Sequence, residues 1–241
     1  MSTYFRFGYG LESPLNRMVF GMPQIDFITS LHNRTSRDYL ARVLEADKAE
    51  CAEIALQWGR DYWDGERKHG YGGMRYDGRW RPVAAEMIAH YGLGPTSRIL
   101  EVGCGKGFLL HEFQQLLPGC AVAGLDISQY AIDHAMPTLA GQLTKGHANS
   151  LPYADQSFDL VVSINTLHNL YNFDLDQALR EIERVARGGK YVVVESYRNE
   201  REKVNLLYWQ LTCRSFYTVP EWEWIFDRAG YRGDYSFIYF T

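Results

Sequence analysis

The chain has 241 residues, a hydrophobic fraction of 46% and a formal net charge of −4. This is enough apolar material to bury one substantial core, so we expect one main domain with an appendage. No apolar run is long enough to cross a bilayer, and the amino terminus lacks the basic-then-apolar pattern of a secretory signal, so we expect a soluble, cytoplasmic protein with no membrane partner. The mild charge and the lack of a basic tail argue against a nucleic-acid partner. The four cysteines form no CxxC or Cys/His ligand pattern, so we expect free thiols and no metal site.

The first part of the chain, residues 1–95, is predicted to be an appendage of arm, helix and flap. Residues 1 to about 34 form an arm of apolar side chains that glycines and prolines interrupt. This arm either packs on its own domain or exchanges across a homodimer, and the sequence leaves both open. Thr35 and Asp38 have capping-box-like spacing, and apolar residues then recur at helical intervals. We therefore predict a long helix from about residue 36 to residue 58.

A loop rich in glycine, aromatic and arginine side chains occupies residues 61–80 and has neither a strand nor a helix period. It is either an ordered surface loop or a flap that folds over a ligand, because glycines let the backbone approach and rings can face a cation. Tyr71, Tyr76 and Trp80 are the candidates for ring contacts, and Arg79 could bind a carboxylate or phosphate. A short helix over residues 83–91 follows.

The central motif is Glu101-x-Gly103-x-Gly105-x-Gly107, which follows an apolar run and precedes an amphipathic one. This order predicts a buried strand, a tight turn and a helix start. Glycines let the turn approach a ligand and adopt positive φ, and the helix start offers free N–H groups. A P-loop is disfavoured because Gly107 follows Lys106, and a dinucleotide fingerprint is disfavoured because its third glycine would fall at Phe108. The turn still predicts a nucleotide-like ligand.

A second buried strand over residues 121–125 ends in Asp126, about twenty positions beyond the glycine turn. A carboxylate at the end of the neighbouring parallel strand can accept both hydroxyl protons of a ribose. Asp126 could instead cap the helix that begins near Ser128, but Ser128 can supply that cap itself. We therefore predict that Asp126 contacts ribose.

A further strand over residues 160–164 leads into residues 165–171, and such loops at the carboxyl ends of parallel strands bind ligands in open α/β sheets. His168 is the leading candidate for a general base, because imidazole titrates near neutral pH; a scaffold role is the alternative. Asp174 is predicted to cap the next helix, which Gly188 and Gly189 end.

Two stretches resemble class I S-adenosylmethionine-dependent methyltransferases. The motif from Glu101 to Gly107 resembles their first motif, and residues 143–159 resemble the Gly-Asp-Ala-x-x-Leu-Pro-Phe...Ser-Phe-Asp segment of the ubiquinone/menaquinone methyltransferase-like subgroup. The resemblance covers residues 97–195. His147 departs from it, because the subgroup usually has an aspartate there that accepts a hydrogen bond from the adenine amino group. Imidazole can accept the same bond if the right tautomer is held.

The resemblance implies S-adenosylmethionine as cofactor and S-adenosylhomocysteine as product. It implies that the glycines shape the loop on the methionine side, that Ile127 and Ala148 form the adenine slot and that Asn165 reaches the amino-acid end. The full predicted cofactor-binding set is Glu101, Gly103, Gly105, Gly107, Asp126, Ile127, Ala148, Asn149, Asn165, Tyr71, Tyr76 and Trp80. The candidates for a catalytic base are His168, His69 and Tyr171.

Alternating strands and helices predict an α/β fold, a Rossmann-like and largely parallel sheet of order 3-2-1-4-5 with helices on both faces. The resembled family ends in two more strands, but only one, over residues 235–240, is evident. The far edge is therefore modified, and the arm or a second subunit could complete it. We place the core at residues 96–241, with an insert at about 196–218 that contains a helix over residues 202–216.

The function that this resemblance implies is methyl transfer to an oxygen or nitrogen of a small polar metabolite. Two alternatives stay open at this point. One is a methyltransferase that acts on protein or RNA, and the other is a non-catalytic S-adenosylmethionine-binding regulatory protein.

Overall fold

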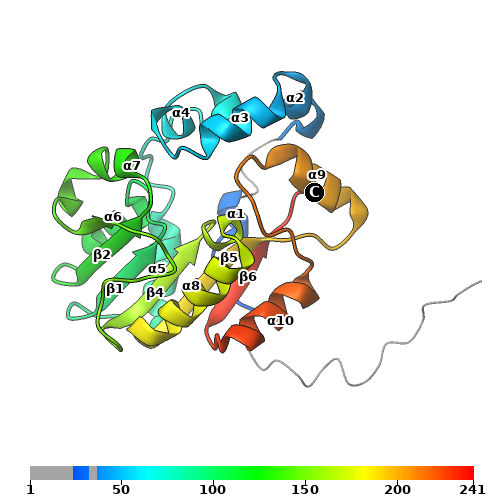
Figure 1. Cartoon of the computed structure of the whole chain (residues 1–241). Coiled ribbons are helices and arrows are strands. Elements are labelled where there is room, and N and C mark those ends of the chain that lie inside the picture. The colour runs from blue at the N-terminus through cyan, green and yellow to red at the C-terminus, as the bar shows by residue number, and fades with distance from the viewer. Residues whose placement is uncertain (1–23, 33–36) are drawn as a thin grey trace, which may run out of the picture.

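The computed structural model describes residues 24–32 and 37–241. Its centre is a six-stranded sheet of order β3-β2-β1-β4-β5-β6, in which each neighbouring pair is parallel (Figure 1). The predicted order 3-2-1-4-5 is confirmed. The strands are β1 (Arg98–Val102), β2 (Ala121–Asp126), β3 (Leu143–Lys145), β4 (Phe158–Ile164), β5 (Ala186–Glu195) and β6 (Asp234–Ile238).

Helices cover both faces of this sheet, and the alternation along each strand decides what they bury. Ile99 belongs to the apolar cluster that α5 and α6 share, whereas the next residue, Leu100, belongs to the cluster of α8 and α10. The α-helices are α1 (Thr29–His32), α2 (Tyr39–Leu44), α3 (Lys48–Ala55), α4 (Arg60–Trp63), α5 (Arg81–Tyr91), α6 (Phe108–Leu116), α7 (Gln129–Asp133), α8 (Asn172–Val185), α9 (Glu200–Trp209) and α10 (Val219–Ala229). Short 3-10 turns are η2 (Arg67–His69), η3 (Pro137–Leu139) and η4 (Leu167–Asn169). None of the helices in the described ranges combines the length and the apolarity that a membrane span requires.

The far edge of the sheet carries one strand after β5, and an amino-terminal segment lies against it. Gln24 forms a parallel bridge with Tyr235 of β6, and the N–H of Ile25 donates to the Tyr235 carbonyl at 3.1 Å. Phe27 is buried, and its ring meets that of Tyr191 edge-on at 5.0 Å. Residues 24–28 therefore pack on their own domain, as one of the two interpretations of the arm expected. The rest of the arm, residues 1–23 and 33–34, lies outside the described residues.

The single helix predicted over residues 36–58 is wrong, because the chain forms two shorter helices there. The carboxylate of Asp38 accepts from the Ala41 N–H and begins α2, while Thr35 lies outside the described residues. The carboxylate of Asp47 accepts from the N–H groups of Ala49 and Glu50 and begins α3. An internal aspartate that satisfies free helix N–H groups favours a new helix start over continuation.

Two predicted boundaries around α8 are also wrong. Asp174 does not cap the helix, because α8 begins at Asn172 with Tyr171 as its N-cap residue. The helix ends at Val185, and Gly188 and Gly189 lie inside β5 instead of ending the helix. Their lack of a side chain is used for close packing, since a Cβ at Gly189 would lie 2.4 Å from the Tyr91 ring. In the insert, α9 ends at Trp209, earlier than the predicted residue 216.

Candidate active site

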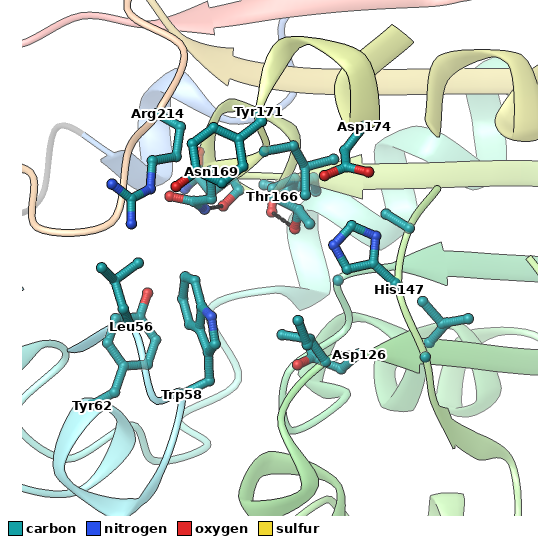
Figure 2. A pocket seen from close by; sticks show the side chains of 18 of the residues that line it. Leu56, Trp58, Tyr62, Asp126, His147, Thr166, Asn169, Tyr171, Asp174 and Arg214 are labelled. Carbon is teal, nitrogen blue, oxygen red and sulfur yellow. Dashed lines mark hydrogen bonds between the residues drawn. The ribbon is translucent and has the colours of Figure 1, made fainter. Parts of the chain in front are cut away.

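A cavity of about 290 Å³ lies at the carboxyl ends of β1, β2 and β4. Opposite the strand ends the cavity is bounded by residues 48–71, which we call the lid. The lid contains α3, α4 and η2 (Figure 1). Figure 2 shows Asp126, His147 and Asp174 at one end and Leu56, Trp58 and Arg214 toward the other. The lining residues are Leu56, Trp58, Tyr62, Trp63, Tyr71, Gly103, Leu125, Asp126, Ile127, Gly146, His147, Ala148, Ile164, Asn165, Thr166, Asn169, Leu170, Tyr171, Asp174 and Arg214.

The glycine turn after β1 has the backbone that the motif predicted, with positive φ at Gly103 (79°), Gly105 (53°) and Gly107 (73°). Gly103 also lines the cavity, and a Cβ there would lie 1.9 Å from Oγ1 of Thr166. A Cβ at Gly105 would lie 2.8 Å from the Trp63 ring of the lid. The turn therefore needs glycine both for its dihedral angles and for close approach.

The lid is fixed to this turn by a partly buried ion pair. Nζ of Lys106 lies 2.7 Å from a carboxylate oxygen of Asp64 and donates to the Met74 carbonyl at 2.8 Å. The Tyr130 hydroxyl donates to the same carboxylate at 2.9 Å. Lys106, the lysine of the glycine turn, thus connects the turn to the lid.

Asp126 lines the cavity, and its carboxylate is held by backbone N–H groups. Oδ2 accepts from the Gly105 N–H at 2.7 Å and Oδ1 from the Ser128 N–H at 2.8 Å. Burial raises the pKa of this carboxyl, and these N–H groups partly offset the rise. The side chain of Ser128 caps α7 by accepting from the Ala131 N–H, so the prediction that Asp126 is not needed as the cap is confirmed. Each carboxylate oxygen retains a lone pair for a ligand hydroxyl.

The loop after β3 forms the wall next to Asp126. Ile127, His147 and Ala148 all line the cavity there. Asn149 is half-buried beside them, and its side-chain amide donates to Oδ1 of Asp174. An apolar slot between Ile127 and Ala148 with polar groups at its rim is a suitable place for a flat heteroaromatic ring.

Among the buried side-chain oxygens that lack hydrogen-bond partners within the described part of the chain are Oδ1 of Asn165, after β4, and Oε2 of Glu101, in β1. Asn165 lines the cavity in a left-handed conformation with φ at 56°. Burial, with the nearby Asp126 as a smaller cause, raises the pKa of Glu101 well above its ordinary value. Because buried polar atoms are normally paired, the Asn165 oxygen marks a position for a ligand donor.

The structure separates the three rings predicted in the flap. Tyr71 lines the cavity and stacks on Trp63 with ring centroids 5.3 Å apart. Tyr76 lies elsewhere, and its hydroxyl donates to Glu112 at 2.6 Å. Trp80 and Arg79 line a second cavity of about 270 Å³, which adjoins the first at Tyr71 and Asn165. Arg79 is already paired with Asp77 there.

Of the three candidate bases, Tyr171 lines the cavity, whereas His168 and His69 do not. His168 is 2% exposed, and its carbonyl accepts from the N–H groups of Arg214 and Ser215 at 2.9 Å each. These are contacts of the backbone carbonyl, and they fix the loop that carries Arg214. His69 lies in η2.

His168 and Glu195 form a buried pair with opposite pKa shifts. Burial lowers the pKa of His168 to about 3, and burial raises the pKa of Glu195 to about 8. Nε2 of His168 lies 3.5 Å from Oε2 of Glu195, and the other Glu195 oxygen accepts from the side-chain amide of Gln210. Both groups are therefore neutral at pH 7, which is the form that a buried site favours.

The central part of the chain is similar to known proteins. Residues 100–194 match the protein family described as "Methyltransferase domain". The chain carries a class I S-adenosylmethionine-dependent methyltransferase domain. Its cofactor is S-adenosylmethionine. The glycine turn, Asp126 and Asn165 all fall within the matched part of the methyltransferase domain.

The chain is 32% identical over 137 residues to a demethylmenaquinone methyltransferase from Roseiflexus castenholzii, with 55% of this chain and 56% of that one covered. It is 31% identical over 145 residues to a tRNA (carboxymethyluridine(34)-5-O)-methyltransferase from Arabidopsis thaliana, with 60% and 34% covered. The chain thus spans less than two thirds of the length of either relative. The solved structure of the YcgJ protein from Bacillus subtilis has the same fold, with a TM-score of 0.51, 22% identity and coverage of 61% of this chain and 66% of that one.

The residues of the methyltransferase domain fit an adenosyl cofactor. Gly103 leaves no room for a side chain, Asp126 offers two oxygens with spare lone pairs, and the buried Asn165 oxygen lacks a partner within residues 24–32 and 37–241. Ribose hydroxyls and an ammonium group are suitable donors to these oxygens. Within the same ranges no group of three or more His, Cys, Asp or Glu side chains is placed to hold a metal ion.

Sequence reasoning missed several lining residues. Trp63 and Tyr62 lie in the stretch whose aromatic content was noted, so that composition could have identified them. Trp58 was assigned to a helix, and Asp174 to a helix cap. Arg214 was not among the predicted site residues; it reaches the cavity from the insert, where its guanidinium lies 5.2 Å from the centroid of the Tyr171 ring.

Proposed function

We propose that the protein transfers the methyl group of S-adenosylmethionine to an oxygen or nitrogen atom of a small polar metabolite and releases S-adenosylhomocysteine. The observation that carries this proposal is one cavity with two different ends. At one end lie Asp126, Ile127 and Ala148, which would hold the adenosyl group. At the other end the lid faces Tyr171 and Arg214, which would hold the acceptor (Figure 2).

The lid supports the choice of a small acceptor. Trp58, Tyr62 and Trp63 line the cavity opposite the strand ends, and the ion pair of Lys106 and Asp64 holds the lid in place. A cavity of about 290 Å³ that lies between a lid and the strand ends suits a compact molecule better than a folded protein or RNA chain.

The lining residues would contribute position and environment. Bound S-adenosylmethionine supplies a methyl group on a positively charged sulfur, which is already a strong electrophile. Holding the acceptor atom in line with that methyl group is therefore the main task of the protein. The rings of Trp63 and Tyr71 line the cavity and would present π faces, which stabilise a nearby cation.

A hydroxyl or protonated amine acceptor must also lose a proton. Tyr171 is the candidate that lines the acceptor end, and the carboxamide of Asn169 lies in the same part of the cavity. The Asn169 oxygen accepts from the Thr212 hydroxyl at 2.8 Å, which fixes the orientation of the amide. The phenolate form of Tyr171 would take the proton, directly or through water, and become the phenol, and Asn169 would orient the acceptor.

The test is methyl transfer from isotopically labelled S-adenosylmethionine to three separate pools: fractionated small metabolites, total tRNA and peptides, each analysed by mass spectrometry. We expect the label in a small-molecule product. Label in tRNA or peptide would refute the acceptor class but leave the methyltransferase assignment. Calorimetric cofactor binding with no labelled product in any pool would favour the regulatory alternative.

A further inference from the structure

We propose that Asp174 and His147 recognise the adenine base of the cofactor as an acceptor and donor pair, with the Asp174 carboxylate accepting from the adenine amine and His147 donating to the adjacent ring nitrogen. The inference rests on the proposed function in one respect, the placement of the adenosyl group at this end of the cavity. Both side chains line that end (Figure 2), and Ile127 and Ala148 line the same cavity.

The Asp174 carboxylate is oriented by one neighbour and has capacity left. Because α8 begins at Asn172, Asp174 is in its first turn and is not used as the cap. The side-chain amide of Asn149 donates to Oδ1. In the part of the chain that the structure describes, no hydrogen bond or ion pair involves Oδ2, so this oxygen is available to a donor inside the cavity.

The hydrogen bonds around His147 decide which ring nitrogen carries the proton. Nδ1 accepts from the backbone N–H of Asn149 at 3.4 Å. An acceptor nitrogen is unprotonated, so the neutral imidazole has its proton on Nε2. His147 therefore presents a donor, and it cannot accept the hydrogen bond from an adenine amine that the resemblance led us to consider. The acceptor has to come from another residue.

Asn149 contacts both side chains. Its side-chain amide donates to the Asp174 carboxylate, and its backbone N–H donates to Nδ1 of His147 and so sets the tautomer. The resulting pattern complements adenine on either edge, since an amine donor adjoins a ring-nitrogen acceptor on both. Hypoxanthine and guanine have a carbonyl oxygen where adenine has its amine. That oxygen would face the Asp174 carboxylate, and two acceptors repel each other.

The test is calorimetric binding of S-adenosylhomocysteine and of S-inosylhomocysteine, which differ in this amine. The wild type is expected to bind the adenosyl compound roughly tenfold to a hundredfold more tightly, the range for a hydrogen bond to a charged group. In Asp174→Asn the amide can turn either its oxygen or its NH2 group to the base, so the preference is expected to fall below about threefold. Asp176→Asn is the matched control, because Asp176 lies on the same helix but pairs with Arg180; it should retain the wild-type preference.

Two outcomes would overturn the proposal that Asp174 and His147 recognise adenine. Equal binding of both compounds by the wild type would show that nothing in the cavity distinguishes the amine. A wild-type preference retained by Asp174→Asn would assign that discrimination to another residue. An Asp126→Ala arm separates these failures from failure of the proposed function: if Asp126→Ala weakens binding and Asp174→Asn leaves the preference intact, the cavity still holds the cofactor and only the adenine assignment falls.

Discussion

Replacement of Asp126 by alanine tests the cofactor site most directly. The carboxylate is 7% exposed, lines the cavity and already accepts one backbone N–H on each oxygen. Alanine removes the acceptors for ribose hydroxyls. We expect S-adenosylhomocysteine binding to weaken by about 1.5–3 kcal/mol, or roughly 10- to 150-fold in Kd, which is the contribution of a hydrogen bond to a charged group.

The same substitution has a second, separable effect on folding. The N–H groups of Gly105 and Ser128 would lose their acceptor, and a buried unpaired N–H costs about 1–3 kcal/mol. We therefore expect a lower free energy of unfolding in urea as well as weaker binding. Asp126→Asn should be intermediate in both, because one acceptor oxygen remains.

Isothermal titration calorimetry with S-adenosylhomocysteine measures the binding effect, and circular dichroism at the same temperature confirms that the variant is folded. Asp133→Ala is the control, since Asp133 is an exposed acid at the end of α7 that accepts from Gln129. A folded Asp126→Ala protein with the wild-type Kd would refute the ribose contact and with it the placement of the cofactor.

Three further substitutions test other parts of the site. Gly103→Ala should lower the free energy of unfolding by more than the roughly 1–3 kcal/mol of backbone strain, and Gly141→Ala, with a similar φ of 76° but open space, should show the strain alone. Arg214→Gln should raise the acceptor KM about tenfold with cofactor affinity unchanged, and a loss of cofactor affinity would contradict the two-ended cavity. Between pH 6.5 and 8 the native state retains a proton on Glu195 for most of the range, whereas the unfolded chain has released it. The free energy of unfolding should therefore fall by about 2 kcal/mol over this range, and Glu195→Gln should abolish the fall in urea titrations. A fall of equal size in the variant would assign it to another group.

The parts of the fold that could be predicted are those that depend on short stretches of sequence alone. The apolar runs that became β1, β2 and β4 needed no tertiary information, and neither did the glycine turn or the acid that ends β2. Their spacing along the chain is enough, because consecutive parallel strands bring their carboxyl ends to one edge.

The rest depended on which of several local options the folded structure favours. Asp38, Asp47 and Asp174 are all acids near helix starts, yet the first two became caps and the third turned toward the cavity. His168 had the chemistry of a base, but its position after β4 directs it into the interior next to Glu195. Arg214 could not be given a role in the site from sequence, because only the path of the insert brings it beside Tyr171.

The two N–H groups that hold Asp126 also bear on how strongly the cofactor can bind. A carboxylate on an unrestrained side chain would lose rotational freedom when a ligand fixes it, and this costs about 0.5–1.5 kcal/mol per immobilised side chain. In this protein that freedom is already lost on folding, because the glycine turn and the start of α7 each hold one oxygen. The acid is thus preorganised, and its contribution to affinity is not reduced by an ordering step at the moment of binding.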